Sequence, residues 1–353
     1  MASLDSLFIG CGVSHTKFMI REYLKLARSF NVVFTGLAPV IGAIAMGEFN
    51  VSMLFLLFLV GFWGHTFGFV YNDIHDYPID KSSKEISDRP LVSGTISIGQ
   101  AWVFAVLAVV SALIVSLIVG VLTHQFYPII ILAVAAGFII LYDVIGKKYP
   151  FTDVFVSLGV FFLILYGAST TVPNLTLISP LAWIVCTLGG IQVFFMQVAG
   201  GIKDIENDSL RGVRTMAVRL GVRVTDGRLH VSSSYKVIAY GIQVLDIIVV
   251  FLPFFIIWNA RGLTPWELGQ WAVLFCLGVV MLLLSHRLLS MSVFERGRAR
   301  MLIGSHYMVN FAMVPIMLMS LNLTTWVLVF LPGIGFLLSN LMLHGTLLQP
   351  KTM

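Results

Sequence analysis

The sequence predicts an all-α protein, a polytopic transmembrane helix bundle of nine to ten helices. The 353 residues are 58% hydrophobic and only 11% charged, with a mean hydropathy of +0.95, which is too apolar for a soluble domain of this size. Apolar runs of roughly 18 to 25 residues recur along the whole chain, each long enough to cross a ~30 Å hydrocarbon core as a helix. The basic residues cluster on one side of these runs, as in multi-pass membrane proteins.

The predicted spans follow one another from near the N-terminus to near the C-terminus. They cover residues 20–46, 52–73, 97–122, 126–144, 152–171, 178–201, 236–258, 266–286, 301–321 and 324–345. Counting the last two runs as one span would give nine helices and place the C-terminus on the opposite side. We expect residues 1–19 to be a cytoplasmic lead-in, residues 20–345 to be a single transmembrane domain and residues 346–353 to be a C-terminal tail.

The distribution of charge predicts the topology of these spans. With the N-terminus in the cytoplasm, every one of the 22 Lys and Arg residues except Arg261 falls at the cytoplasmic side. This asymmetry follows the positive-inside rule and favours an even number of spans with both termini cytoplasmic. It also explains the net charge of +5 without a nucleic-acid partner. The chain is therefore predicted to associate with a lipid bilayer and with no nucleic acid.

An acidic motif stands at the end of the second predicted span. Asp73, Asp76 and Asp80 are spaced i, i+3 and i+7, which places them on one face of a helix, and Asn72 precedes them. Clustered carboxylates repel one another unless a hard cation lies among them, and Mg²⁺ prefers oxygen ligands. The alternative, a solvated acidic helix end, is disfavoured because Asp is costly near an apolar span.

A second acidic motif follows the sixth predicted span. Asp204 and Asp208 are one helical turn apart and are preceded by Lys203. Two such clusters meeting across a helix bundle could hold two Mg²⁺ ions against a diphosphate and neutralise its growing charge as it departs. This arrangement suits heterolysis of an allylic carbon–oxygen bond, which leaves a carbocation that must be shielded from water.

The paired motifs, Asn72-Asp73-x-x-Asp76-x-x-x-Asp80 and Asp204-x-x-x-Asp208, resemble the signatures of the UbiA superfamily of intramembrane prenyltransferases. The run from Arg89 to Gly94 and the pair Arg28-x-x-Asn31 also resemble that family, and the likeness covers roughly residues 24 to 225. The resemblance implies a UbiA-type fold and a prenyltransferase domain over residues 20–345.

The resemblance also implies roles for individual residues. It assigns metal and diphosphate binding to Asn72, Asp73, Asp76, Asp80, Asp204 and Asp208, and among these it makes Asp73, Asp76, Asp204 and Asp208 catalytic. It suggests that the diphosphate or the acceptor contacts Arg28, Asn31, Tyr142 and Lys147, and the charge of Lys203 beside Asp204 makes that residue a further candidate contact. The Tyr142–Lys147 spacing is one residue longer than is usual in the family. Lys148 is therefore an alternative to Lys147, and both lysines could simply be topology charges.

The predicted function is Mg²⁺-dependent transfer of a prenyl group from a polyprenyl diphosphate to a lipophilic acceptor, with release of diphosphate. The resemblance favours an aromatic acceptor, as in quinone biosynthesis. One alternative is a membrane terpene cyclase that needs no acceptor. Another is a cation-coupled transporter, which is disfavoured because its ligands are expected near the bilayer midplane, whereas both motifs lie at helix ends. Asp246, in the seventh span, has no predicted role.

Overall fold

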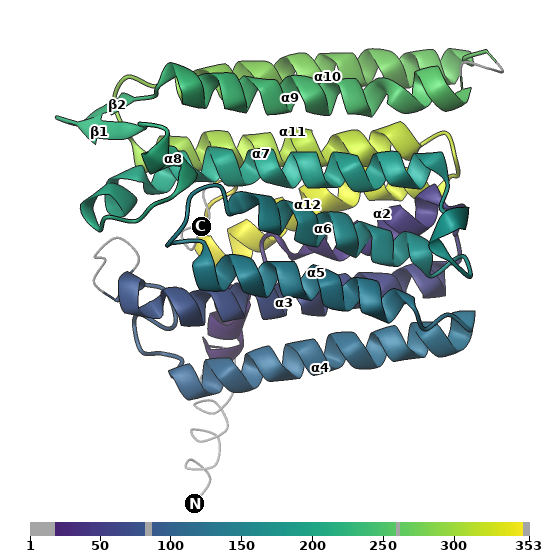
Figure 1. The fold of residues 1–353 in the computed structure, drawn as a ribbon, viewed down its shortest axis with the longest axis horizontal. Helices are drawn as coiled ribbons and strands as arrows, with labels where there is room; N and C mark the ends of the chain where they lie inside the picture. The colour runs from purple at the N-terminus through teal and green to yellow at the C-terminus, as the bar shows by residue number, and fades with distance from the viewer. Residues whose placement is uncertain (1–17, 82–86, 259–261, 349–353) are drawn as a thin grey trace, which may run out of the picture.

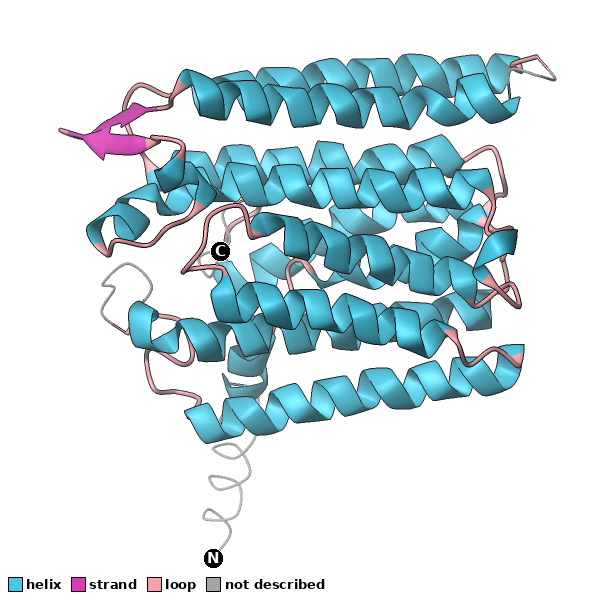
Figure 2. Ribbon diagram, in the orientation of Figure 1, coloured by secondary structure: helices cyan, strands magenta, loops and turns pink. Residues whose placement is uncertain are grey.

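The computed structural model describes residues 18–81, 87–258 and 262–348, which form a bundle of long helices lying side by side (Figure 1). Helices make up nearly all of it, with one small hairpin of strands at an edge (Figure 2). The helices are α2 (Val32–Ala45), α3 (Val51–Asp80), α4 (Ile98–Thr123), α5 (Pro128–Ile145), α6 (Asp153–Ser169), α7 (Pro180–Leu210), α8 (Met216–Arg219), α9 (Ser233–Pro253), α10 (Pro265–Leu289), α11 (Arg296–Leu318) and α12 (Thr324–His344). A 3₁₀ turn (η2, Leu175–Leu177), a π turn (η3, Phe254–Trp258) and strands β1 (Arg223–Thr225) and β2 (Arg228–His230) complete the described part.

The helix count agrees with the upper of the two predicted numbers. Within the described ranges, eight helices are long and apolar enough to cross a membrane, and α2 and α6 are shorter apolar helices. Each of the ten predicted spans therefore corresponds to a helix, and the chain is a multi-pass integral membrane protein. Most of the predicted lead-in (residues 1–17) and most of the predicted tail (residues 349–353) lie outside the described residues. The same is true of Arg261.

The first predicted span is not one continuous helix, as the sequence had suggested. Residues 18–26 are helical, residues 27–31 form a turn, and α2 begins only at Val32. Arg28 lies in this turn with a left-handed φ of 46°. The buried His65 ring holds the turn through Nδ1 and the Thr35 hydroxyl (2.9 Å) and through Nε2 and the Arg28 carbonyl oxygen (3.3 Å).

Most of the long helices begin at polar residues that cap their N-termini. Ser97 and Gln100 form a capping box at α4, and Thr264 and Glu267 form another at α10. At α7 the Ser179 hydroxyl accepts a hydrogen bond from the Ala182 amide. These caps satisfy backbone donors where the chain enters the membrane.

Helices α3 and α7 are longer than their predicted spans and carry the acidic motifs within their last turns. The spans were expected to end at residues 73 and 201, but α3 runs to Asp80 and α7 to Leu210. The segment after α7 contains α8 and the β1–β2 hairpin, in which Arg223 pairs with His230. These extensions carry the motif carboxylates on rigid helices.

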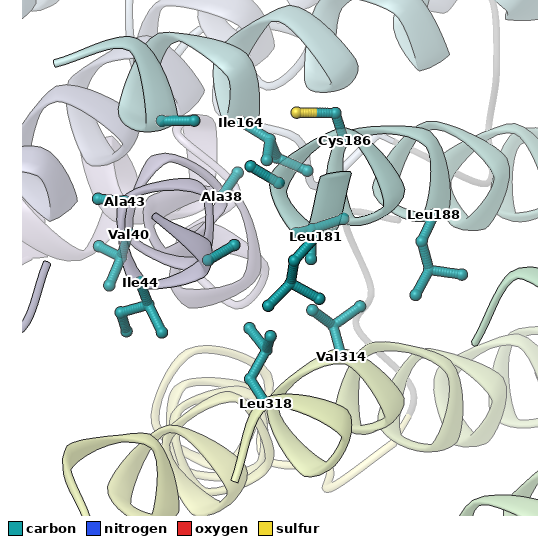
Figure 3. Close-up of a cluster of buried hydrophobic side chains, with 14 of the residues drawn as sticks. Ala38, Val40, Ala43, Ile44, Ile164, Leu181, Cys186, Leu188, Val314 and Leu318 are labelled. Carbon is teal, nitrogen blue, oxygen red and sulfur yellow. The ribbon is translucent and has the colours of Figure 1, made fainter. Parts of the chain in front are cut away.

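Helix α2 occupies the centre of the bundle, where it contacts α3, α6, α7, α11 and α12. Helices α9 and α10 form an outer layer against α7 and α11, and α4 packs chiefly on α3 at the opposite edge (Figure 1). Figure 3 shows part of the core, a single buried cluster that includes Ile44 of α2, Ile164 of α6, Leu181 of α7 and Leu318 of α11.

Two glycines allow α2 and α6 to cross at very short range. A Cβ atom on Gly167 would lie 1.8 Å from the Pro39 carbonyl oxygen, and one on Gly42 would lie 2.1 Å from the Ile164 carbonyl oxygen. Such small residues let helix backbones approach closely in membranes, where packing rather than the hydrophobic effect drives association. The crossing fixes α2 beside α6 and thereby positions the Arg28 turn.

Candidate active site

The first acidic motif occupies the last two turns of α3. Asp73, Asp76 and Asp80 are buried, with 5%, 8% and 8% of their surfaces exposed. Asn72 is half-buried and donates from Nδ2 to Asp143 Oδ1 (3.0 Å), which leaves its carbonyl oxygen available as a ligand. The His75 ring Nδ1 contacts the Tyr71 carbonyl oxygen (3.1 Å), and the ring lies beside Tyr71 and Trp102. Carboxylate and amide oxygens are therefore the main potential metal ligands at this end of α3.

The second motif lies on the last turns of α7. Asp208 is buried, and its Oδ2 accepts a hydrogen bond from the Thr215 hydroxyl (3.2 Å). Asp204, one turn earlier, pairs with Lys203 through Oδ2. Asp204 Oδ1 lies 2.7 Å from Arg296 Nη2 at the start of α11.

Cationic side chains neutralise nearly every carboxylate of the two motifs. Arg28 Nη2 lies 2.7 Å from Asp73 Oδ1, and the Arg28 guanidinium also stacks 4.9 Å from the Phe69 ring centroid. Arg89 Nη1 lies 2.5 Å from Asp80 Oδ2 and 3.7 Å from Asp73 Oδ1. These pairs compensate for the desolvation of charges that would otherwise be costly to bury.

The structure distinguishes between the two lysines after α5. Lys147 Nζ lies 3.7 Å from Asp76 Oδ2, whereas Lys148 is exposed. Burial alone would lower the pKa of Lys147, but the carboxylates of Asp76, Asp208 and Asp204 raise it above its ordinary value. Lys147 is thus a charged contact of both motifs.

Arg89 joins the two motifs in the same way. Burial opposes its charge, yet the carboxylates of Asp73, Asp80, Asp204 and Asp76 together raise its pKa. Arg89 and Lys147 contact carboxylates of α3 and are influenced by the charges on α7, so the two motifs belong to one polar site.

This polar site opens into a cavity of about 650 Å³ inside the bundle. The residues that line it include most of the predicted site residues, namely Arg28, Asn31, Asn72, Asp76, Asp80, Tyr142, Lys147, Lys203, Asp204 and Asp208. Asp73 is not among them but is paired with Arg28 and Arg89, which are. The ionic site and the space beside it are therefore continuous.

The rest of the cavity has two chemically different walls. Aliphatic side chains of α4, α5 and α6 form one wall, among them Leu113, Ile140 and Leu163. Aromatic side chains of α2 and α11 form the other, among them Phe34 and Phe311. Such an arrangement suits a ligand or ligands with a charged head and long apolar parts.

The chemistry of the donors at the polar end fits Mg²⁺, which prefers carboxylate and amide oxygens. Within the part of the chain that the structure describes, no three His, Cys, Asp or Glu side chains are close enough to bind a metal ion as they stand. The reason is that Arg and Lys occupy the positions between the carboxylates.

The sequence profile of the UbiA prenyltransferase family matches residues 31–305 of this chain, a segment that contains both acidic motifs. The chain belongs to the UbiA prenyltransferase family. It is accordingly a prenyltransferase, as the paired motifs had predicted.

Relatives within the UbiA family support the same conclusion. The chain is 28% identical over 247 residues to the digeranylgeranylglyceryl phosphate synthase of Saccharolobus solfataricus, covering 68% of this chain and 79% of that protein. Its fold is similar to the apo structure of a UbiA homolog from Aeropyrum pernix K1, with a TM-score of 0.63, 15% identity and coverage of 81% of this chain and 94% of the other. A UbiA homolog from Archaeoglobus fulgidus bound to GPP and Mg²⁺ gives a TM-score of 0.61, 14% identity and coverage of 84% and 98%.

Sequence reasoning missed some residues that line this UbiA-family site. Arg296 resembled any other topology charge, because nothing in the sequence indicates that α11 returns to Asp204. Asp143 follows Tyr142 directly, yet only the fold shows that it binds the Asn72 amide. Arg214, which follows the second motif in the sequence, is exposed, and its backbone amide donates a hydrogen bond to the Lys147 carbonyl oxygen (3.3 Å).

Proposed function

We propose that this enzyme binds a Mg²⁺–prenyl diphosphate between α3 and α7 and transfers the prenyl group to a hydroxyl of a glycerol phosphate lipid. The observation that carries this proposal is that residues of both Asp motifs, with Asp76, Asp80 and Asp208 buried, line one cavity that continues into apolar space. We assign the metal ions, two in number, to the oxygens of Asn72, Asp73, Asp76, Asp80, Asp204 and Asp208.

In the reaction, the allylic carbon–oxygen bond of the donor breaks and its electron pair leaves with the diphosphate. When bound, Mg²⁺ neutralises the negative charge that grows on that leaving group. Arg28, Lys147 and Lys203 contribute hydrogen bonds to the diphosphate oxygens once their carboxylates are engaged. An acceptor hydroxyl oxygen then forms the new carbon–oxygen bond, and its proton passes to the released diphosphate.

The apolar cavity would hold the prenyl chain and exclude water from the allylic cation. We place the chain against the aliphatic wall of α4, α5 and α6, where Leu113 and Leu163 lie. The Phe69 ring, already close to a guanidinium, presents a π face at the junction of the two regions.

The acceptor proposal departs from the aromatic ring expected from the sequence. The relatives that match this chain are named as digeranylgeranylglyceryl phosphate synthases, which indicates a glycerol phosphate lipid. We further propose that residues 20–345 act as one catalytic domain. The motif ends of the helices, and both termini, would face the cytoplasm because the basic residues gather there.

The test is prenyl transfer by the purified protein in lipid. Diphosphate release and product mass are measured with Mg²⁺, donors of several chain lengths, and either a phosphorylated glycerol ether, a phenolic acceptor or no acceptor. We expect Mg²⁺-dependent release that requires the glycerol ether. Release without any acceptor would indicate a cyclase, transfer to the phenol alone would restore the aromatic acceptor, and absence of release under all conditions would refute the proposal.

A further inference from the structure

One face of α11 combines positive charge with aromatic surface. Arg296, Arg300, Tyr307 and Phe311 are spaced i, i+4, i+11 and i+15, so they lie along the same side of the helix. Arg296, Tyr307 and Phe311 line the cavity of the active site. The charged end of this face lies beside Asp204, and the aromatic end lies deeper in the bundle.

The two arginines lie close to the same carboxylate. Guanidinium groups one turn apart on a helix repel each other, and Arg296 is already paired with Asp204 (2.7 Å). Arg300 is attracted by the charges of Asp204 and Asp88 and repelled by that of Arg89, and its buried Nε has no hydrogen-bond partner among the described residues. The single negative charge of Asp204 therefore acts on the positive charges of Arg296, Arg300 and Lys203 at the same time.

Metal binding would draw the Asp204 carboxylate away from these two arginines. Under the proposed function Asp204 becomes a ligand of Mg²⁺, and the arginines of α11 then lose their principal carboxylate. Lys203 adjoins the diphosphate site on α7, whereas Arg296 and Arg300 approach from another helix. A second anion beside the diphosphate would restore the balance, because arginine binds phosphate oxygens through two parallel hydrogen bonds.

The aromatic part of the same face gives an apolar chain a surface to lie on. The Phe34 ring of α2 stacks on Tyr307 at 5.9 Å and lies 4.9 Å from Phe311. Tyr307 and Phe311 are themselves stacked at 5.6 Å. These rings come from α2 and α11, whereas the aliphatic lining assigned to the donor chain comes from α4, α5 and α6.

We infer that the α11 face is the acceptor site, in which Arg296 and Arg300 bind the terminal phosphate of a lipid whose chain lies along Phe34, Tyr307 and Phe311. This inference rests on the proposed function and assigns the residues that recognise the phosphate of its acceptor. It also gives the two arginines a role beyond topology.

The decisive variant is Arg300→Gln, because Arg300 contacts neither the donor nor the metal in the proposed arrangement. Its matched control is Arg298→Gln, which removes the same charge from an exposed position two residues away on α11. Each protein is tested with a prenyl glycerol ether bearing a terminal phosphate and with the same ether lacking it. Acceptor KM, donor KM and direct binding of the phosphorylated ether without donor are measured.

We expect Arg300→Gln to raise the acceptor KM and weaken binding of the phosphorylated ether by roughly tenfold or more, with the donor KM unchanged. For the ether without phosphate, the wild type should be as poor as the variant, and Arg298→Gln should match the wild type throughout. Arg300→Lys should recover part of the loss.

Equal effects of Arg300→Gln on the two ethers, or equal effects of Arg298→Gln and Arg300→Gln, would overturn the inference. Failure of the proposed function has a different signature, since the wild type would then transfer no prenyl group to either ether. The binding measurement does not need turnover, so it decides on the phosphate site in that case too.

Discussion

At the scale of single residues, the site is a set of Asp carboxylates paired with Arg and Lys side chains. Asp73, for example, is almost wholly buried and pairs with both Arg28 and Arg89. Buried ion pairs of this kind contribute little net stability, because desolvation offsets much of their attraction. Their value here is that the same carboxylates and guanidiniums can be redistributed between metal and diphosphate.

Removal of one motif charge should therefore abolish activity while preserving the fold. We expect Asp73→Asn to lower kcat by roughly 100-fold or more, because it removes a metal ligand charge without changing side-chain volume. Turnover and thermal unfolding of the purified protein check this. Asp88→Asn, at an exposed position near the same helix end, is the control and should behave as the wild type. Full turnover by Asp73→Asn would refute the site assignment.

The two adjacent lysines after α5 should respond differently to substitution. Lys147→Ala removes a charge 3.7 Å from Asp76, and we expect the donor KM to rise roughly tenfold or more, as for loss of a charged hydrogen bond. Lys148→Ala removes an exposed charge and should leave the donor KM within about twofold. Steady-state kinetics with a fixed acceptor concentration make the comparison. A larger effect at Lys148 would show that the wrong lysine has been chosen.

At the scale of helices, the crossing of α2 and α6 depends on the absence of side chains. Gly167→Ala would place a methyl group 1.8 Å from the Pro39 carbonyl oxygen, a contact that only movement of a backbone can relieve. We expect a loss of several kcal/mol of stability, or failure to fold, measured by thermal unfolding in detergent. Gly241→Ala in α9 is the control, since its methyl group would meet nothing within 4 Å. Equal stability of the two variants would contradict the close crossing.

Asp246 provides a second test at this scale. It is buried in α9, close to Gln192, and neither carboxylate oxygen makes a hydrogen bond of ordinary geometry. An acidic group in such surroundings is costly when charged, so Asp246→Asn should leave the melting temperature unchanged or raise it. Activity should stay within about twofold of the wild type. A large loss of activity in a folded variant would instead give Asp246 a part in the reaction.

At the scale of the whole molecule, ion pairs tie the Arg28 turn and Arg89 to the end of α3, and another ties α11 to α7. Metal and diphosphate should replace these links with stronger ones, because they bridge carboxylates and cations at the same time. Ligand binding is therefore coupled to the stability of the bundle.

This coupling predicts a cooperative gain in thermal stability. We expect Mg²⁺ and diphosphate together to raise the melting temperature by more than the sum of their separate effects, and EDTA to reverse the gain. Asp204→Asn should abolish the cooperative part without unfolding the protein. Strictly additive shifts in the wild type would show that the ions and the diphosphate bind independently of each other.

The sequence by itself determined the membrane class, the succession of nine to ten apolar spans and the two acidic motifs. It could do so because hydropathy and helical spacing are local properties: Asp73, Asp76 and Asp80 share a face whatever the rest of the chain does. The lengths of α3 and α7 were less certain, since their last turns are polar and fall outside an apolar run.

Only the tertiary structure decided which distant residues meet. The Arg28 turn depends on His65, the choice of Lys147 over Lys148 depends on where α5 ends beside Asp76, and Arg296 reaches Asp204 because α11 packs against α7. These contacts join residues as many as 92 positions apart, as for Arg296 and Asp204. No local pattern encodes such a distance, because it arises from how complete helices pack.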